Sequence, residues 1–89
     1  MKLLLCLKCN DIFNLADSTK ECSCKETGGR YLDHVDAVYW GHYAVPLGFD
    51  NLSVRKALIQ RPNMGKGSRF QAFVIPKNCS TMNRINRRP

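Results

Sequence analysis

The sequence predicts a small α+β protein: an N-terminal, cysteine-rich β-hairpin followed by a small antiparallel sheet that carries one helix. Three observations predict this class. The chain has 89 residues, 44% hydrophobic and 24% charged, which is typical of one small folded unit and not of a disordered chain. Four of its five cysteines lie between residues 6 and 24. Beyond residue 30, short apolar stretches alternate with glycine and proline, and one segment has a helix cap and a helix stop.

The early cysteines have the spacing Cys6-x2-Cys9, then twelve residues, then Cys22-x-Cys24. Two close cysteine pairs on tight turns can surround one ion with four thiolates, which is a common ligand set of structural zinc sites. Asn10 follows Cys9, where such a turn often needs a left-handed backbone conformation that asparagine tolerates. The spacing therefore predicts a structural Zn²⁺ bound by Cys6, Cys9, Cys22 and Cys24.

Alternatives to zinc stay open from the residues alone. A disulfide or redox pair of Cys6 and Cys9 lacks the βαβ pattern that surrounds thioredoxin-like pairs. Iron in a rubredoxin-like site would use the same four sulfurs. Cys79 is either a free thiol or the substitute for a wrongly assigned ligand. Because four thiolates fill all four coordination positions of a tetrahedral ion, we expect no catalysis at this metal.

By this spacing, residues 1–29 resemble a zinc ribbon, a family built from two cysteine knuckles on β-hairpins. The resemblance implies the same four ligands. The second knuckle departs from the family, because it is Cys-x-Cys instead of the commoner Cys-x-x-Cys, and Lys25 instead of glycine follows it. In size and layout the whole chain resembles short zinc-headed proteins encoded by bacteriophages, which implies that binding a host component is a candidate role.

Side-chain alternation predicts the strands of the first hairpin at residues 2–8 and 12–15. The stretch "KETGGR" is expected to be a flexible hinge. We therefore expect three parts: a zinc knuckle hairpin at residues 1–29, a small α+β domain at 30–77, and a flexible basic tail at 78–89.

Aromatic and β-branched residues predict two further strands at about residues 36–40 and 42–46, with an earlier piece at 31–32. Pro46 is expected to restrict the second of these strands to an edge or an end of the sheet. Residues 70–75 place apolar side chains on both faces, which predicts a central strand.

The helix is expected at residues 50–61, with an N-cap at residue 50 or 51 and Pro62 after its end. At about 100° per residue it has two apolar faces, one formed by Val54, Ala57 and Leu58 and a nearly opposite one by Leu52 and Ile59. Such a helix is either covered on two sides, which is the arrangement we expect, or exposes an apolar strip to a partner.

The positive charge lies in the C-terminal part of the chain. The formal net charge is +7, and residues 51–89 contain no acid and nine bases: Arg55, Lys56, Arg61, Lys66, Arg69, Lys77, Arg84, Arg87 and Arg88. Such a field attracts nucleic acid, nucleotides or an acidic protein surface. The alternative is that the charge serves solubility. The loop "NMGKGSR" lacks the spacing of a P-loop, although its backbone amides can cradle an anion.

Planar side chains and cations supply the candidate ligand-binding residues. Aromatic stacking combined with phosphate pairing is how proteins hold single strands and nucleotides. The candidates are Trp40, His42, Tyr43, Arg55, Arg61, Lys66 and Arg69. Trp40 and Tyr39 are also the obvious residues to fill the core of so small a sheet.

No catalytic signature accompanies the two histidines, His34 and His42, or pairs either of them with Cys79, so we expect no enzyme activity. The sequence predicts a non-enzymatic, zinc-stabilised binding module for an anionic partner, either nucleic acid or a nucleotide. One alternative is a phage-encoded inhibitor that binds a host protein as an anti-defence or host-takeover factor. Another is a redox protein that uses Cys6 and Cys9.

The N-terminal apolar run ends at Lys8 after five residues, whereas the core of a secretory signal has about 7–15. No stretch approaches the roughly 20 apolar residues of a membrane span. We therefore expect a protein with no membrane association that stays in the cytoplasm, where disulfides rarely persist, and in the host cytoplasm if the chain is phage-encoded.

Overall fold

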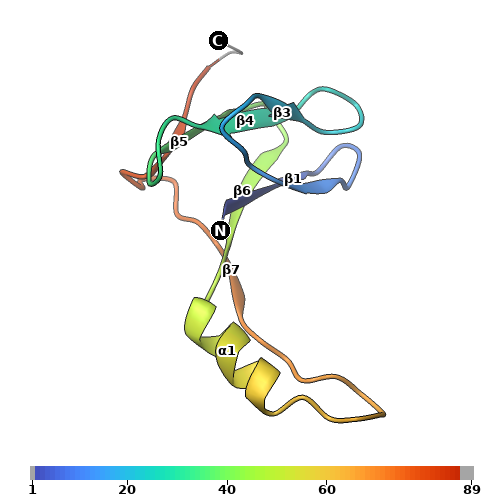
Figure 1. Ribbon diagram of the computed structural model, residues 1–89. Helices are drawn as coiled ribbons and strands as arrows, with labels where there is room; N and C mark the ends of the chain where they lie inside the picture. Colours follow the sequence, from blue (N-terminus) through green and yellow to red (C-terminus); the bar gives the residue numbers. More distant parts are fainter. Residues whose placement is uncertain (1, 87–89) are drawn as a thin grey trace.

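The computed structural model describes residues 2–86, which form two four-stranded β-sheets and, within that range, one helix (Figure 1). The first sheet has the order β2-β1-β6-β7 and consists of β1 (Lys2–Cys6), β2 (Ile12–Asn14), β6 (Ala44–Phe49) and β7 (Ala72–Val74). The second has the order β3-β4-β5-β8 and consists of β3 (Lys20–Glu21), β4 (Gly28–Tyr31), β5 (Ala37–Trp40) and β8 (Met82–Arg84). The helix α1 spans Asn51–Ile59. The expected α+β class is confirmed.

The strands of the N-terminal segment are divided between the two sheets. The hairpin β1–β2 is antiparallel and belongs to the first sheet, whereas β3 and β4 belong to the second. β1 also pairs with β6, and β4 with β5, so both sheets cross the boundary expected at residue 29. One antiparallel sheet was expected, but the second sheet contains a parallel pair, β5–β8, which needs a long crossover connection.

Both sheets contribute side chains to one hydrophobic core. All four residues of β5 are buried. The first sheet supplies Leu4 and Ala44, and the second supplies Ala37, Tyr39 and Met82. The two sheets therefore bury apolar surface against each other, which is the main driving force available to so small a chain.

Pro46 was expected at an edge or an end of the sheet, and this expectation was wrong, because β6 lies between β1 and β7. The Ile75 N–H donates to the Pro46 carbonyl over 2.9 Å, so the side of Pro46 that lacks an N–H faces β7. β7 ends one residue earlier, at Val74. The missing donor therefore falls where the β6–β7 pairing stops, and it costs no regular ladder bond.

The expected central strand at residues 70–75 is also wrong. Only Ala72–Val74 form a strand, and β7 lies at the edge of its sheet. All three residues are exposed, with Val74 at 64%. Apolar side chains on both faces of this segment predicted that the strand is buried, whereas in the structure they lie on an open edge of the sheet.

The helix begins as expected, because the Asp50 carboxylate accepts a hydrogen bond from the Leu52 N–H over 3.2 Å. The expectation that it is covered on two sides was wrong. Ala57 is its only buried residue, while Leu52 and Ile59 are 72% and 85% exposed. The structure instead shows the other arrangement, in which the helix exposes an apolar strip to solvent.

We call residues 50–71 the arm. It leaves the first sheet at the end of β6, forms α1, and returns to β7 (Figure 1). At its base the Asp50 N–H donates to the Gln71 carbonyl over 2.9 Å. The molecule measures 45 × 26 × 22 Å, and its radius of gyration is 14.6 Å. A compact chain of this length would have about 12 Å, so the arm makes the molecule elongated.

Two segments that were expected to be flexible are ordered parts of the second sheet. Gly28 and Gly29, the expected hinge, are buried in β4, and a Cβ on Gly28 would lie 2.6 Å from the Trp40 ring. The expected flexible tail contains β8, whose Met82 is 1% exposed. Arg87 and Arg88 lie outside the described residues. Within residues 2–86, the helix is too short to cross a membrane.

Candidate metal centre

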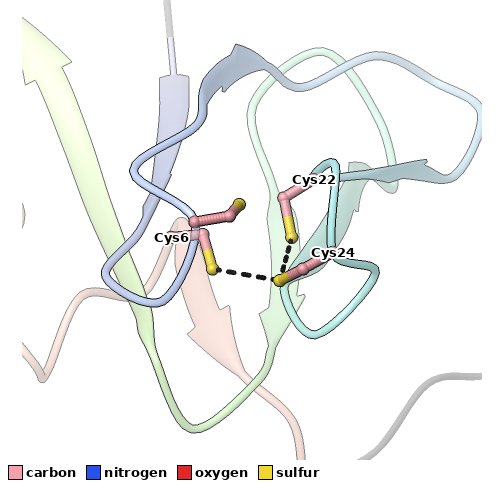
Figure 2. Close-up of side chains that lie close together, drawn as sticks. Cys6, Cys22 and Cys24 are labelled. Carbon is pink, nitrogen blue, oxygen red and sulfur yellow. Dashed lines mark hydrogen bonds between the residues drawn. The ribbon is translucent and has the colours of Figure 1, made fainter.

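The four early cysteines meet at one point in the structure. Their sulfur atoms all lie within 4.8 Å of one another. Figure 2 shows Cys6, Cys22 and Cys24 pointing toward one another from two separate loops. The Cys24 sulfur lies 3.8 Å from that of Cys6 and 3.5 Å from that of Cys22. The structure thus brings together the complete ligand set that the spacing predicted.

These distances fit an ion and exclude a disulfide. Sulfurs that are about 2.3 Å from a tetrahedral ion lie about 3.8 Å apart, close to the values found. A disulfide needs about 2 Å, and all four cysteines are free thiols. The cluster therefore has the geometry and the soft donors of a four-thiolate metal centre.

The two knuckles have nearly the same backbone despite their different spacing. In the first, the Cys6 N–H donates to the Asp11 carbonyl over 2.9 Å. In the second, the Cys22 N–H donates to the Thr27 carbonyl, also over 2.9 Å. In both knuckles the acceptor lies five residues after the donor. Residues Asn10 and Lys25 each follow the second cysteine of a pair and have positive φ angles of 61° and 64°. The Cys-x-Cys pair therefore makes a regular knuckle.

Side chains also join the knuckles. One Asp11 carboxylate oxygen accepts hydrogen bonds from the Ser23 N–H and hydroxyl, each over 3.1 Å. Lys8 and Glu26 form an ion pair over 3.2 Å, which is exposed and contributes little free energy of its own. No sequence pattern indicates these pairs, because their partners are separated by 12 residues (Asp11 and Ser23) and 18 residues (Lys8 and Glu26).

The thiols differ in their tendency to ionise. Burial would raise the pKa of Cys6, but the neighbouring Thr27 side chain and the backbone N–H groups of Cys9 and Lys8 lower it to about 6. At Cys24 the Glu26 N–H lowers the pKa, but burial and the neighbouring thiols raise it to about 12. Crowded thiolates repel one another, so all four ionise together only with a cation among them.

Because each knuckle belongs to a different sheet, one ion in this cluster would connect the two sheets. Cys6 ends β1 of the first sheet, and Cys9 follows in the turn to β2. Cys22 and Cys24 lie between β3 and β4 of the second sheet. The centre is therefore placed to hold the core together from one end.

The candidate ligand-binding residues do not form one site. Trp40 is 5% exposed, and its ring packs over Gly28, so its indole offers no free face for stacking. His42 and Tyr43 lie in the turn before β6, with ring centroids 5.1 Å apart. The bases lie on the arm, at the other end of β6, and all are exposed: Arg55, Arg61, Lys66 and Arg69. Along β6 this separation is about 20 Å.

Cys79 is separate from the metal cluster, and its sulfur lies 3.4 Å from the Thr81 hydroxyl. Hydrogen bonding to the Thr81 side chain, and then to its backbone N–H, lowers the pKa of the Cys79 thiol. With metal bound, we expect one thiol per chain to react with a disulfide reagent at neutral pH. Thr81→Val should raise the pKa of Cys79 and slow the reaction severalfold, measured by absorbance. Rapid reaction of more than one thiol in the metal-loaded chain would contradict this assignment.

Comparisons of the chain with protein-family models, with curated proteins and with solved structures gave no match.

Proposed function

We propose that the chain is a non-enzymatic, zinc-stabilised module that uses its arm to bind an acidic surface of another protein in the cytoplasm. Zinc suits a centre of four thiolates with no open position, because such sites stabilise folds and leave no room for a substrate at the metal. The observation that supports protein binding is the exposed helix α1, whose Leu52 and Ile59 are 72% and 85% exposed.

Exposed apolar side chains gather on the arm. They are Leu52, Leu58, Ile59, Met64 and Phe70. Leu52 and Ile59 share one face of α1. Exposed apolar side chains that lie close together are typical of protein interfaces, whose binding energy comes from a few buried anchors. A groove of ≈ 600 Å³ between α1 and the returning segment, lined by Leu52, Ala57 and Phe70 among others, adds a concave part to this surface.

The charge of the arm indicates the sign of the partner. The arm contains five bases and one acid, Asp50, and that carboxylate caps the helix. A partner with acidic residues around an apolar patch complements it, and the attraction accelerates association. A phage-encoded inhibitor that binds a host protein, the alternative that the sequence left open, would be one form of this function.

Nucleic acid is the second candidate partner, and the five exposed bases favour it. The burial of Trp40 and the distance of His42 and Tyr43 from these bases favour protein, since stacking surfaces and phosphate-pairing groups are not side by side.

The double variant Leu52→Ser/Ile59→Ser should lose the partner and keep the fold. With two exposed anchors removed, we expect at least tenfold less partner protein to be retained from nuclease-treated cell extract, quantified by mass spectrometry. The matched control is Leu32→Ser/Val35→Ser, because these residues are 55% and 58% exposed and lie between β4 and β5, away from the arm. Equal retention by both variants would contradict the proposal. If a parallel extract without nuclease treatment yields bound nucleic acid instead, and this binding weakens steeply with salt, the second candidate holds.

A further inference from the structure

The edge strand β7 presents unpaired backbone groups. β7 pairs with β6 only, in the register Leu47↔Val74, Gly48↔Phe73 and Phe49↔Ala72. The bonds of Ile75 to Pro46 and of Asp50 to Gln71 show that odd-numbered residues of this segment face β6. Because backbone direction alternates along a strand, the N–H and C=O groups of Ala72 and Val74 point away from the sheet. Among residues 2–86 no strand other than β6 pairs with β7, so no strand lies on the side to which these groups point.

This edge lacks the usual protection against pairing. Proteins protect edge strands with charged residues, proline or bulges, because an open edge invites another strand. Residues 70–75, "FQAFVI", contain none of these and are bounded by Arg69 and Pro76. By contrast, the edges of the second sheet carry charges: β3 has Lys20 and Glu21, and β8 has Arg84.

Apolar side chains accompany the open edge on both faces. Val74 lies on one face and is 64% exposed. Phe73 lies on the other, is 51% exposed, and its ring covers Gly48, where a Cβ would come within 2.7 Å of it. A strand added here would therefore bury apolar surface on both faces as well as satisfying backbone groups.

We propose that an extended segment of the acidic partner protein adds to the first sheet as a strand beside β7. This inference rests on the proposed function and specifies how the partner binds. β7 leads directly into the arm, with its five bases and one acid. The segment should therefore have apolar or β-branched residues on both faces of the strand and acidic residues at the end nearest the arm. A second copy of this chain would bring the same positive charge to the same place and is disfavoured.

The test uses the full, zinc-loaded chain and a synthetic peptide of alternating valine and threonine with two aspartates at one end. The peptide should protect the Ala72 and Val74 amides from hydrogen exchange, measured by NMR. Val74→Pro removes an outward N–H and no bond to β6, and it should weaken peptide binding about tenfold. The matched control Val74→Thr keeps both the N–H and the branched shape, so its binding should change less than threefold.

Each outcome decides between explanations. Unprotected amides at millimolar peptide in the unaltered chain, or a folded Val74→Pro chain that binds normally, overturn strand addition. A dimer that Val74→Pro dissociates would assign the edge to a second copy and also overturn it. If Leu52→Ser/Ile59→Ser loses the captured protein while Val74→Pro retains it, the proposed function stands without strand addition. If the helix variant retains everything, the proposed function fails whatever the peptide does.

Discussion

Replacing Cys24 by serine is expected to weaken zinc binding roughly a hundredfold and to destabilise the whole molecule. The Cys24 sulfur lies close to the sulfurs of Cys6 and Cys22, so its removal leaves one of the four coordination positions empty. Comparable four-ligand sites bind zinc with about 10–16 kcal/mol, so a quarter of this energy is about 3 kcal/mol, or roughly a hundredfold in affinity. Native mass spectrometry in the presence of a competing chelator should show one zinc in the parent chain and none in the variant.

The melting temperature should fall with the metal, because the knuckles belong to different sheets and lose their common link. A loss of about 3 kcal/mol lowers the melting temperature by about 12–24 °C in a chain of this size. Cys79→Ser is the matched control, since that thiol lies outside the cluster and should change neither zinc content nor melting temperature. Retention of a full zinc equivalent by Cys24→Ser would refute the four-sulfur assignment.

Gly41→Ala is also expected to destabilise the fold strongly. Gly41 has a φ of +116°, a conformation that alanine adopts only with strain of about 1–3 kcal/mol. A Cβ there would also lie 2.4 Å from the Glu26 carbonyl oxygen and 3.0 Å from the Thr27 Cα, both of the second knuckle. These are backbone atoms, so relief requires a shift next to the metal ligands, at about 1–3 kcal/mol more. Chemical denaturation should show a loss of about 2–6 kcal/mol.

Gly65→Ala separates the two causes. Gly65 also has a positive φ, +86°, but a Cβ there meets no atom within 4 Å. Its substitution should cost only the strain, about 1–2 kcal/mol. Similar losses for the two variants would show that the close approach to the second knuckle is not part of the folded structure.

The parts of the fold that could be predicted from the sequence are those in which neighbouring residues decide the outcome. The cysteine spacing, the left-handed Asn10 and the Asp50 cap are each set within a few residues, and all three are found. The left-handed conformation of Lys25 could not be predicted in the same way, because lysine rarely has a positive φ angle. Here it completes the second knuckle, which the hydrogen bond from the Cys22 N–H to the Thr27 carbonyl closes.

The parts that could not be predicted depend on pairing between distant segments. The parallel pair Ala37↔Met82 joins residues on opposite sides of the arm, and no local pattern indicates it. The apolar residues of α1 and β7 were interpreted as core because burial is the usual fate of such residues. Whether they are buried depends on which elements pack over them. Among residues 2–86, α1 has a single buried residue and β7 has none.

The Asp50–Gln71 bond at the base of the arm means that the chain leaves and rejoins the first sheet at neighbouring positions. In topological terms, the arm is an insertion between two strands of a hairpin. An insertion closed in this way can lengthen, shorten or change its sequence without altering the strand register on either side. The sequence of residues 51–70 can therefore vary while the two sheets and the cysteine cluster stay the same.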